Sequence, residues 1–236
     1  MLQQFEPESM VKFFTCIIYG MRRIGKTVLC KYILSKLVDR FDEAYLFSQT
    51  ANLQGDTWNC IHKDYRVEGF DETRLRNVIE GQKRLIKAAE QVKKTSGVVV
   101  PIPSVMIVMD DVVSDRAVQR SELLTELFIL GRHLKMYLMI LSQNACASGS
   151  INVACRNNVD YCIASWFNNR DDFDRLATYY YGMEGKKVGC ATIQRLTQVP
   201  FTFAVANLHA QGRTQLSDFV RVMKAPNPDE NPQLYE

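Results

Sequence analysis

Residues 20–27 read Gly-Met-Arg-Arg-Ile-Gly-Lys-Thr and fit the phosphate-binding pattern G-x-x-x-x-G-K-[ST]. In this pattern the glycines let backbone N–H groups turn toward phosphates, and the positive end of the following helix dipole adds attraction. A plain strand-to-helix turn is the alternative, but the flanking residues also match the setting of a phosphate loop. We expect Lys26 to reach the β- and γ-phosphates and Thr27 to bind Mg²⁺. The predicted nucleotide-contacting residues are Gly20, Met21, Arg22, Arg23, Ile24, Gly25, Lys26, Thr27 and Val28.

Two acidic residues, Asp110 and Asp111, directly follow the apolar run SVMIVM at 104–109. A carboxylate at the end of such a strand, opposite a phosphate-binding loop, holds Mg²⁺, usually through water. We therefore expect Asp110 at the metal and Asp111 as the acid that polarises the attacking water. Because Asp often begins turns, an ordinary strand-ending turn is the alternative.

Gln143 follows a further apolar run, YLMIL at 137–141. P-loop ATPases with a catalytic acid place another strand between the P-loop strand and the acid-bearing strand, and a polar side chain at its end faces the γ-phosphate. An amide suits that position, because it donates one hydrogen bond to phosphate and accepts another from water. We interpret Gln143 as a sensor of the γ-phosphate; a surface polar group is the alternative.

The charge on a transferring phosphoryl group also calls for an arginine, which in ring-shaped ATPases often comes from a neighbouring subunit. Arg156 lies in a polar stretch, CRNNVD at 155–160, which we interpret as a turn with an exposed guanidinium facing an adjacent protomer. An arginine that is solvated or forms a salt bridge is the alternative. The full set of candidates is Arg132, Arg156, Arg170 and Arg175.

Hydrophobic periodicity predicts strands and helices in alternation around these residues. One predicted helix follows the loop and runs through Leu37, and a second begins at Asp71 as its N-cap. A further helical segment lies near 171–181. Between these, another helix carries an apolar stripe of Leu123, Leu127, Leu130 and Leu134. Residues 49–69 show no clear period. This alternation predicts a mainly parallel sheet with helices on both faces. The predicted strands are 13–19, 44–48, 104–109, 137–141, 159–164 and 201–206.

Composition indicates one folded domain spanning 1–236, since the chain has 236 residues with 47% hydrophobic and 23% charged. We place the core at about 11–210, and we expect a loose tail over 225–236, which carries Pro226, Pro228 and Pro232. The net charge of +3 permits a nucleic-acid partner without arguing for one. No apolar run is long enough for a membrane helix.

Cysteine and histidine usage argues against zinc and against nucleophilic catalysis. The seven cysteines are an odd number without a C-x-x-C pair, which favours a reducing compartment. His62, His133 and His209 have no partner at metal or triad spacing.

The segments GMRRIGKT, VMIVMDDV, GRHLKMYLMILSQ and CRNNVDYCI together resemble the FtsK–HerA superfamily of P-loop motors, in particular the genome-packaging ATPases of large DNA viruses and virophages. The resemblance covers about 13–203 and implies a RecA-like (ASCE) α/β fold. It also implies Lys26 and Thr27 at nucleotide and magnesium, Asp110 at magnesium, Asp111 as catalytic acid, Gln143 as sensor and Arg156 as the arginine finger. Many P-loop motors have Glu where this chain has Asp111, although an Asp-Asp pair occurs in the packaging branch.

The resemblance implies an ATP-driven, Mg²⁺-dependent subunit of a homo-oligomeric ring, hexamer or pentamer, that moves double-stranded DNA into a capsid. It further implies capsid vertex proteins as partners and a location in the virion or at the assembly site in the host cytoplasm. The alternatives are a HerA-like cellular or plasmid DNA translocase or helicase, which would carry larger companion domains, and a nucleotide-dependent assembly switch. Candidate flexible stretches for DNA contact are 49–69, 95–103 and 146–151.

Overall fold

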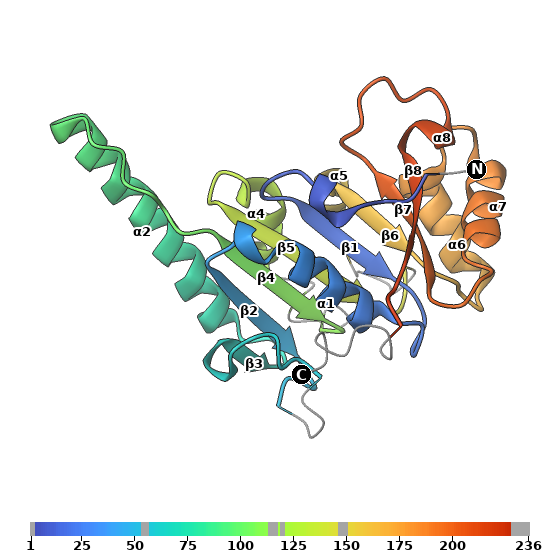
Figure 1. The fold of residues 1–236 in the computed structure, drawn as a ribbon, viewed down its shortest axis with the longest axis horizontal. Coiled ribbons are helices and arrows are strands. Elements are labelled where there is room, and N and C mark those ends of the chain that lie inside the picture. The colour runs from blue at the N-terminus through green and yellow to red at the C-terminus, as the bar shows by residue number, and fades with distance from the viewer. Residues whose placement is uncertain (1–2, 53–56, 113–117, 119–120, 146–150, 228–236) are drawn as a thin grey trace.

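The computed structural model describes residues 3–52, 57–112, 118, 121–145 and 151–227, and it contains one eight-stranded sheet in the order β3-β2-β4-β5-β1-β6-β7-β8 (Figure 1). The strands from β3 to β6 in this order are parallel, whereas β7 is antiparallel to β6 and to β8. The strands are β1 (Thr15–Tyr19), β2 (Glu43–Ser48), β3 (Arg66–Glu68), β4 (Val105–Asp110), β5 (Met136–Ser142), β6 (Tyr161–Ala164), β7 (Thr202–Asn207) and β8 (Val220–Lys224).

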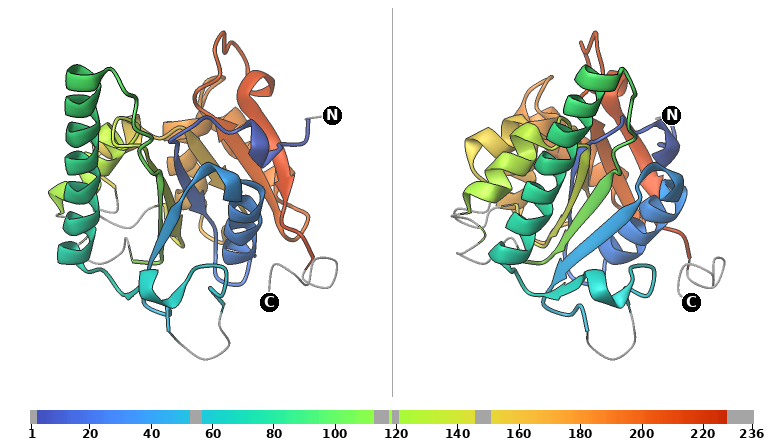
Figure 2. Two further views of the ribbon diagram at one scale, coloured as in Figure 1. Left: turned by 60° about the vertical axis from the view of Figure 1, so that its left-hand side comes forward. Right: turned by 90° about the vertical axis from the view of Figure 1, so that its left-hand side faces the viewer.

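Helices cover both faces of this sheet, with α1 on one face and α2 on the other (Figure 2). The α-helices are α1 (Lys26–Lys36), α2 (Glu72–Ser96), α4 (Glu122–Leu130), α5 (Val153–Asn157), α6 (Arg170–Leu176), α7 (Lys186–Leu196) and α8 (Leu216–Phe219). The shorter helical turns are η1 (Pro7–Ser9), η2 (Val38–Arg40), η3 (Lys63–Tyr65) and the π-helical η4 (Ala177–Tyr181). The prediction of a mainly parallel sheet with helices on both faces is confirmed.

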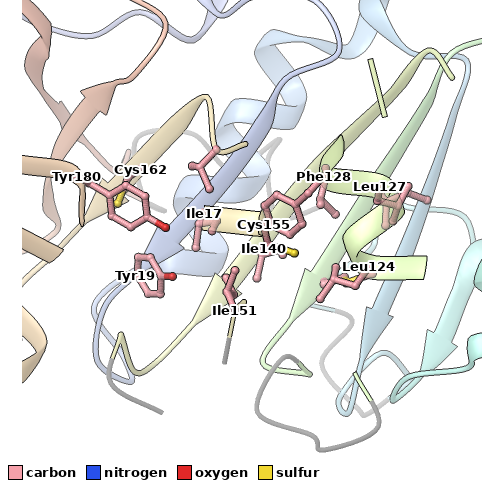
Figure 3. Close-up of a cluster of buried hydrophobic side chains, with 14 of the residues drawn as sticks. Ile17, Tyr19, Leu124, Leu127, Phe128, Ile140, Ile151, Cys155, Cys162 and Tyr180 are labelled. Carbon is pink, nitrogen blue, oxygen red and sulfur yellow. The ribbon is translucent and has the colours of Figure 1, made fainter. Parts of the chain in front are cut away.

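The central strands are apolar on both faces because both faces are covered. Every residue of β1 and β4 is buried. Side chains alternate between two core clusters: Ile17 and Tyr19 join the cluster beneath α4, whereas Cys16 and Ile18 join the cluster beneath α1. Figure 3 shows Ile17 and Tyr19 in the first of these clusters, with Leu124, Leu127 and Phe128 of α4.

Two strand starts differ from the predicted ones for the same backbone reason. β1 begins at Thr15 rather than at Phe13, and β7 begins at Thr202 rather than at Phe201. Phe13 (φ 58°) and Phe201 (φ 61°) both adopt the left-handed conformation, which interrupts an extended strand. β6 likewise starts later than predicted, at Tyr161.

The predicted helical stripe ending at Leu134 is too long. α4 ends at Leu130, whose side chain is exposed, and Leu134 is buried after the helix has ended. The chain turns back instead, with the Met136 N–H donating to Gly131 O at 2.9 Å and a left-handed backbone at Lys135. Leu134 therefore keeps the helical spacing of the earlier leucines although it lies beyond the end of the helix.

Several elements near the C-terminus were not predicted, namely α7, α8 and β8, and the short β3 lies in the stretch 49–69 that showed no period. The core consequently extends beyond 11–210, since Phe5 and Met223 are buried. The start of the expected loose tail is ordered as well, because Ala225 is buried and donates its N–H to Phe201 O at 2.9 Å. Pro228 and Pro232 lie outside the described residues.

The helix predicted from Asp71 is confirmed as α2, and Asp71 caps it by accepting the Arg74 N–H at 2.9 Å. Its buried residues are Leu75, Ile79 and Gln82, all in its first half, so the second half projects from the body (Figure 1). In the described part of the chain, no helix is both long and apolar enough to cross a membrane.

The thiols of Cys16, Cys30, Cys155 and Cys162 are buried within the core and are not in disulfides. Cys60 and Cys190 are likewise not in disulfides, and Cys146 lies outside the described residues. The buried cysteines pack as small apolar side chains.

Candidate active site

The loop after β1 turns sharply around its own glycines. Gly20 continues the β1–β5 pairing through its N–H to Ser142 O at 3.1 Å, and Gly25 (φ 90°) ends the loop as the N-cap of α1. A Cβ at Gly20 would lie 2.9 Å from Ile24 Cγ2 and 3.0 Å from Ser165 Cβ, closer than side-chain atoms normally approach. The loop backbone thus requires glycine at both positions.

Lys26 is the first residue of α1 and lies inside the loop. Its Nζ donates to Gly20 O at 2.8 Å and to Met21 O at 2.9 Å. Burial lowers the pKa of Lys26, and the carboxylates of Asp111 and Asp110 oppose that effect. The ammonium is therefore held by the loop's carbonyls and lies in the electrostatic field of both aspartates.

Asp110 and Asp111 stand at the end of β4, and β5 lies between β4 and β1, as the sequence predicted. Successive side chains of a strand normally point to opposite faces. The left-handed backbone of Asp111 (φ 55°) breaks this alternation, and both carboxylates line the same cavity. Burial raises the pKa of Asp110 to about 6, with a further rise from Asp111, whereas Lys26 and the Trp58 indole act to lower it.

Gln143 lies just after β5 and connects the P-loop to the acid. Its Nε2 donates to Asp111 Oδ2 at 2.6 Å, and its Oε1 accepts from Arg22 Nε at 3.1 Å. The structure therefore brings together the amide, the second aspartate and the loop, as their order along the chain suggested.

These groups surround one open cavity of about 520 Å³ at the carboxyl ends of the parallel strands. Ligands of α/β sheets bind at this edge. Three of its residues were not predicted: Thr50, which lies two residues after β2, Thr57, which lies further along the chain, and Phe201, which precedes β7. The same rule about strand ends could have indicated Thr50, whereas Phe201 precedes an antiparallel strand and gave no such signal. The lining residues are Arg22, Arg23, Gly25, Lys26, Thr27, Val28, Thr50, Thr57, Asp110, Asp111, Gln143 and Phe201.

The donor set of the cavity suits a magnesium ion. Mg²⁺ takes oxygen ligands, usually one or two carboxylates together with phosphates and water. Asp110 and the hydroxyl-bearing Thr27 line the cavity together. Because the buried Asp110 carboxyl has a raised pKa, a divalent cation beside it would favour its charged form.

Arg156 differs from its predicted setting. It lies in the helix α5 rather than in a turn, and it is half-buried rather than exposed. Its Nη1 donates to Ile151 O at 2.5 Å, and its guanidinium lies 4.5 Å from the centroid of the Tyr179 ring. None of the four candidate arginines is among the residues that line the cavity of this chain.

The candidate DNA-contacting stretches are placed only in part. Residues 95–103 include the exposed end of α2 and the exposed Val98, Val99 and Val100. Of the other two stretches, 53–56 and 146–150 lie outside the described residues.

Comparison with known proteins adds a family and a set of structural relatives. The model of the family described as "Poxvirus A32 protein" matches residues 2–191. No curated protein matches the chain at a significant level.

Among solved structures, the genome packaging NTPase B204 from Sulfolobus turreted icosahedral virus 2, in complex with AMPPCP, aligns with a TM-score of 0.55 and 13% identity, covering 94% of this chain and 100% of that one. The pCW3 conjugation coupling protein TcpA aligns with a TM-score of 0.64 and 15% identity, covering 93% of this chain and 62% of that one. The cytoplasmic domain of the Thermomonospora curvata type VII secretion ATPase EccC aligns with a TM-score of 0.57 and 15% identity, covering 90% of this chain and 25% of that one. At these identities the likenesses show a shared fold, which is the predicted P-loop ATPase fold.

Proposed function

The chain belongs to the Poxvirus A32 protein family, and on this premise we propose that it is an ATP-driven motor subunit that moves double-stranded DNA into a viral capsid. The fold is shared with B204, a genome packaging NTPase whose structure contains a nucleotide analogue. The sequence resemblance to genome-packaging ATPases of large DNA viruses supports the same activity.

One observation carries the hydrolytic part of the proposal: the P-loop, two aspartates and an amide line a single cavity. A loop that only bound phosphate would need no acid and no amide opposite it. The 2.6 Å hydrogen bond between Gln143 and Asp111 fixes the direction of the acid, and its second bond to Arg22 fixes the amide.

The residues divide the work by their chemistry. The backbone N–H groups of the loop and the ammonium of Lys26 bind the β- and γ-phosphates, which the N-terminus of α1 also attracts. Thr27 and Asp110 would hold Mg²⁺, which would supply positive charge against the phosphates. Asp111 accepts a hydrogen bond from the attacking water and orients it, and Gln143 reports the presence of the γ-phosphate to the loop through Arg22.

Arg156 acts in trans in this proposal. Within its own chain it does not line the cavity, so it would serve the site of the next subunit in a closed ring, hexamer or pentamer. Duplex DNA passes through the ring, and the capsid vertex receives it. In this proposal the protein works at the assembly site in the host cytoplasm or in the virion.

The decisive experiment measures the ATPase rate against the length of added duplex DNA. A translocating ring should hydrolyse more ATP per binding event on longer duplexes, and the stimulation should fall steeply with salt because phosphate contacts dominate binding. Lys26→Ala and Asp111→Asn should each abolish turnover, and only Lys26→Ala should also weaken nucleotide binding strongly.

A nucleotide-dependent assembly switch would give a different result. It would oligomerise with ATP in sedimentation runs, yet its turnover would be slow and independent of DNA length. Normal turnover in both variants would contradict hydrolysis at this site.

A further inference from the structure

Phe201 is a bulky residue held in an unfavourable backbone conformation beside the P-loop. Its φ of 61° lies in the left-handed region, where a Cβ crowds the backbone and bulky residues are rare. Its side chain is 47% exposed although it is aromatic. Strained residues of this kind persist where the surrounding structure fixes them, and they cluster at ligand-binding sites.

The sheet edge fixes Phe201 in place. Its carbonyl oxygen accepts the Ala225 N–H at 2.9 Å, and the Thr202 N–H donates to Val199 O at 3.2 Å. These bonds belong to the start of β7 and the end of β8, the antiparallel pair at one side of the sheet (Figure 1). The ring approaches the P-loop so closely that a Cβ at Gly25 would lie 3.0 Å from Phe201 Cδ1.

The order of the strands places Phe201 on the side of the P-loop away from the acid. Asp111 follows β4, which is two strands from β1 on one side, and Phe201 precedes β7, which is two strands from β1 on the other. At about 4.8 Å per strand, each residue stands roughly 10 Å along the sheet from the P-loop strand. Because β7 is antiparallel, its first residue lies at the same edge as the ends of the parallel strands.

This placement matches the two ends of a nucleotide. The γ-phosphate must face Asp111 and Gln143, so the rest of the nucleotide must leave the loop in another direction. Lys26, Val28 and Phe201 line the same cavity as Asp111 and Gln143. An aromatic ring there offers a flat apolar face to a flat base.

We propose that Phe201 is the base-binding residue of the site, and that its ring stacks on the adenine of bound ATP. The inference rests on the proposed nucleotide-binding function and adds the part of the site that distinguishes a nucleotide from a bare triphosphate. The stack gives this strained, exposed aromatic side chain a function in ligand binding.

Calorimetric titration with Mg·ATP and, separately, with magnesium tripolyphosphate tests the proposal, because only ATP carries a base. Phe201→Gly should bind ATP roughly tenfold more weakly than the unmodified protein, in line with the usual worth of one base–aromatic stack. Its affinity for tripolyphosphate should be unchanged. Phe201→Tyr should restore ATP binding, and Val199→Ala, an exposed change two residues away, should behave as the unmodified protein does.

The melting temperature separates this role from a structural one. Glycine adopts a φ of 61° without strain, so Phe201→Gly should melt no lower than the unmodified protein. Equal ATP affinity in Phe201→Gly and the unmodified protein would overturn the proposal. So would an equal loss of ATP and tripolyphosphate affinity, because the ring would then support the P-loop and not the base.

Failure of the proposed function would give a separate pattern. In that case the unmodified protein would bind neither ligand, or Lys26→Ala would bind both as well as the unmodified protein does. If Lys26→Ala loses both ligands and Phe201→Gly loses neither, nucleotide binding stands and the role of Phe201 falls.

Discussion

The two adjacent aspartates at the end of β4 differ in their burial and in their hydrogen bonding. Asp110 is buried and close to Lys26, and its pKa is raised to about 6. Asp111 lies partly exposed in a left-handed turn, with Gln143 bonded to its Oδ2. A cation beside the buried carboxylate would favour its charged form, whereas the second carboxylate has its direction fixed by an amide.

Asp110→Asn should stabilise the nucleotide-free protein while abolishing Mg²⁺-dependent turnover. The pKa of Asp110 in the folded state, about 6, lies above the ordinary value of about 3.9, so the folded state binds more protons between these values. Stability from this group is therefore fully present below about pH 4 and is lost as the pH rises through 6. At pH 8 the loss amounts to about 3 kcal/mol, because a change of one pKa unit corresponds to about 1.4 kcal/mol.

Thermal unfolding of both proteins without nucleotide, at pH 8 and at pH 4.5, checks this prediction. The melting temperature of Asp110→Asn should exceed that of the unmodified protein by several degrees at pH 8, and the difference should shrink at pH 4.5. A variant that melts at a lower temperature at pH 8 would show that ionised Asp110 does not destabilise the folded state.

Gln143→Ala should lower kcat by roughly 10²-fold and leave the KM for ATP nearly unchanged, which is typical for loss of one aligned donor. The change removes the bonds to Asp111 and to Arg22, so the acid loses its fixed direction while the P-loop keeps its shape. Steady-state kinetics measures both constants. Gln194→Ala, on α7, provides a control glutamine away from the site, and equal kcat values in the two variants would contradict the sensor role.

Arg156→Ala should lose turnover but regain part of it when mixed with Lys26→Ala subunits, because each variant would supply what the other lacks. The substitution also removes the contact with the Tyr179 ring at 4.5 Å, so stability must be measured in parallel. Arg213→Ala provides the matched control, since Arg213 lies 5.5 Å from the centroid of the Phe219 ring. If Arg156→Ala loses stability as Arg213→Ala does but keeps its kcat, Arg156 is structural.

At the scale of elements, the buried central strands could be predicted from the sequence, because burial on both faces gives each of them a continuous apolar run. β1, β4 and β5 are central strands, and their apolar runs predicted them to within two residues at each end. The positions of Asp110 and Gln143 at the cavity followed, because the ends of neighbouring parallel strands share an edge. The P-loop was readable for the same reason, as it connects the first of these strands to α1.

Elements at the margin of the sheet were not readable from the sequence. β8 has a mixed burial pattern, and it pairs with the antiparallel β7 and, through an isolated bridge at Val222, with Gln4. Its residues show neither a continuous apolar run nor a clean alternation. α7 buries few of its residues, Gly189 and Ile193 among them, which gives a weak helical stripe. Phe201 depends on both the β7–β8 pair and a left-handed backbone, and no local pattern predicts that combination.

Two glycines in different elements should respond in opposite ways to alanine. Gly20→Ala should weaken nucleotide binding and destabilise the fold, because its Cβ would press on Ile24 and Ser165 at 2.9 and 3.0 Å. Gly81→Ala, in the interior of α2 with no described atom within 4 Å of the new Cβ, should stabilise the fold by about 1 kcal/mol. Thermal unfolding and an ATP titration of each variant test the pair. A harmless Gly20→Ala would mean that Ile24 and Ser165 move aside to admit the added Cβ.

Across the whole molecule, the order of the strands in the sheet sets the spacing between the residues of the site. The acid, the amide, the P-loop and Phe201 follow or precede β4, β5, β1 and β7, which are neighbours or near neighbours in the strand order. The core clusters above and below hold these strands in register. A change in any central strand should therefore affect stability and catalysis together.

The second half of α2 lies outside this arrangement, which leads to the last prediction. Replacement of residues 88–101 by a short Gly-Ser turn should leave the melting temperature and the ATP affinity close to those of the unmodified protein. None of these side chains is buried. The remaining first half of α2 stays attached to the body, because Gln82 Nε2 donates to Pro103 O at 2.8 Å and to Leu134 O at 3.2 Å. By contrast, Leu75→Ala in the first half of α2 removes a fully buried side chain and should destabilise the fold by about 2–5 kcal/mol. Thermal unfolding and ATP titration compare the two variants. Loss of cooperative unfolding in the shortened protein would show that residues 88–101 contribute to the stability of the core.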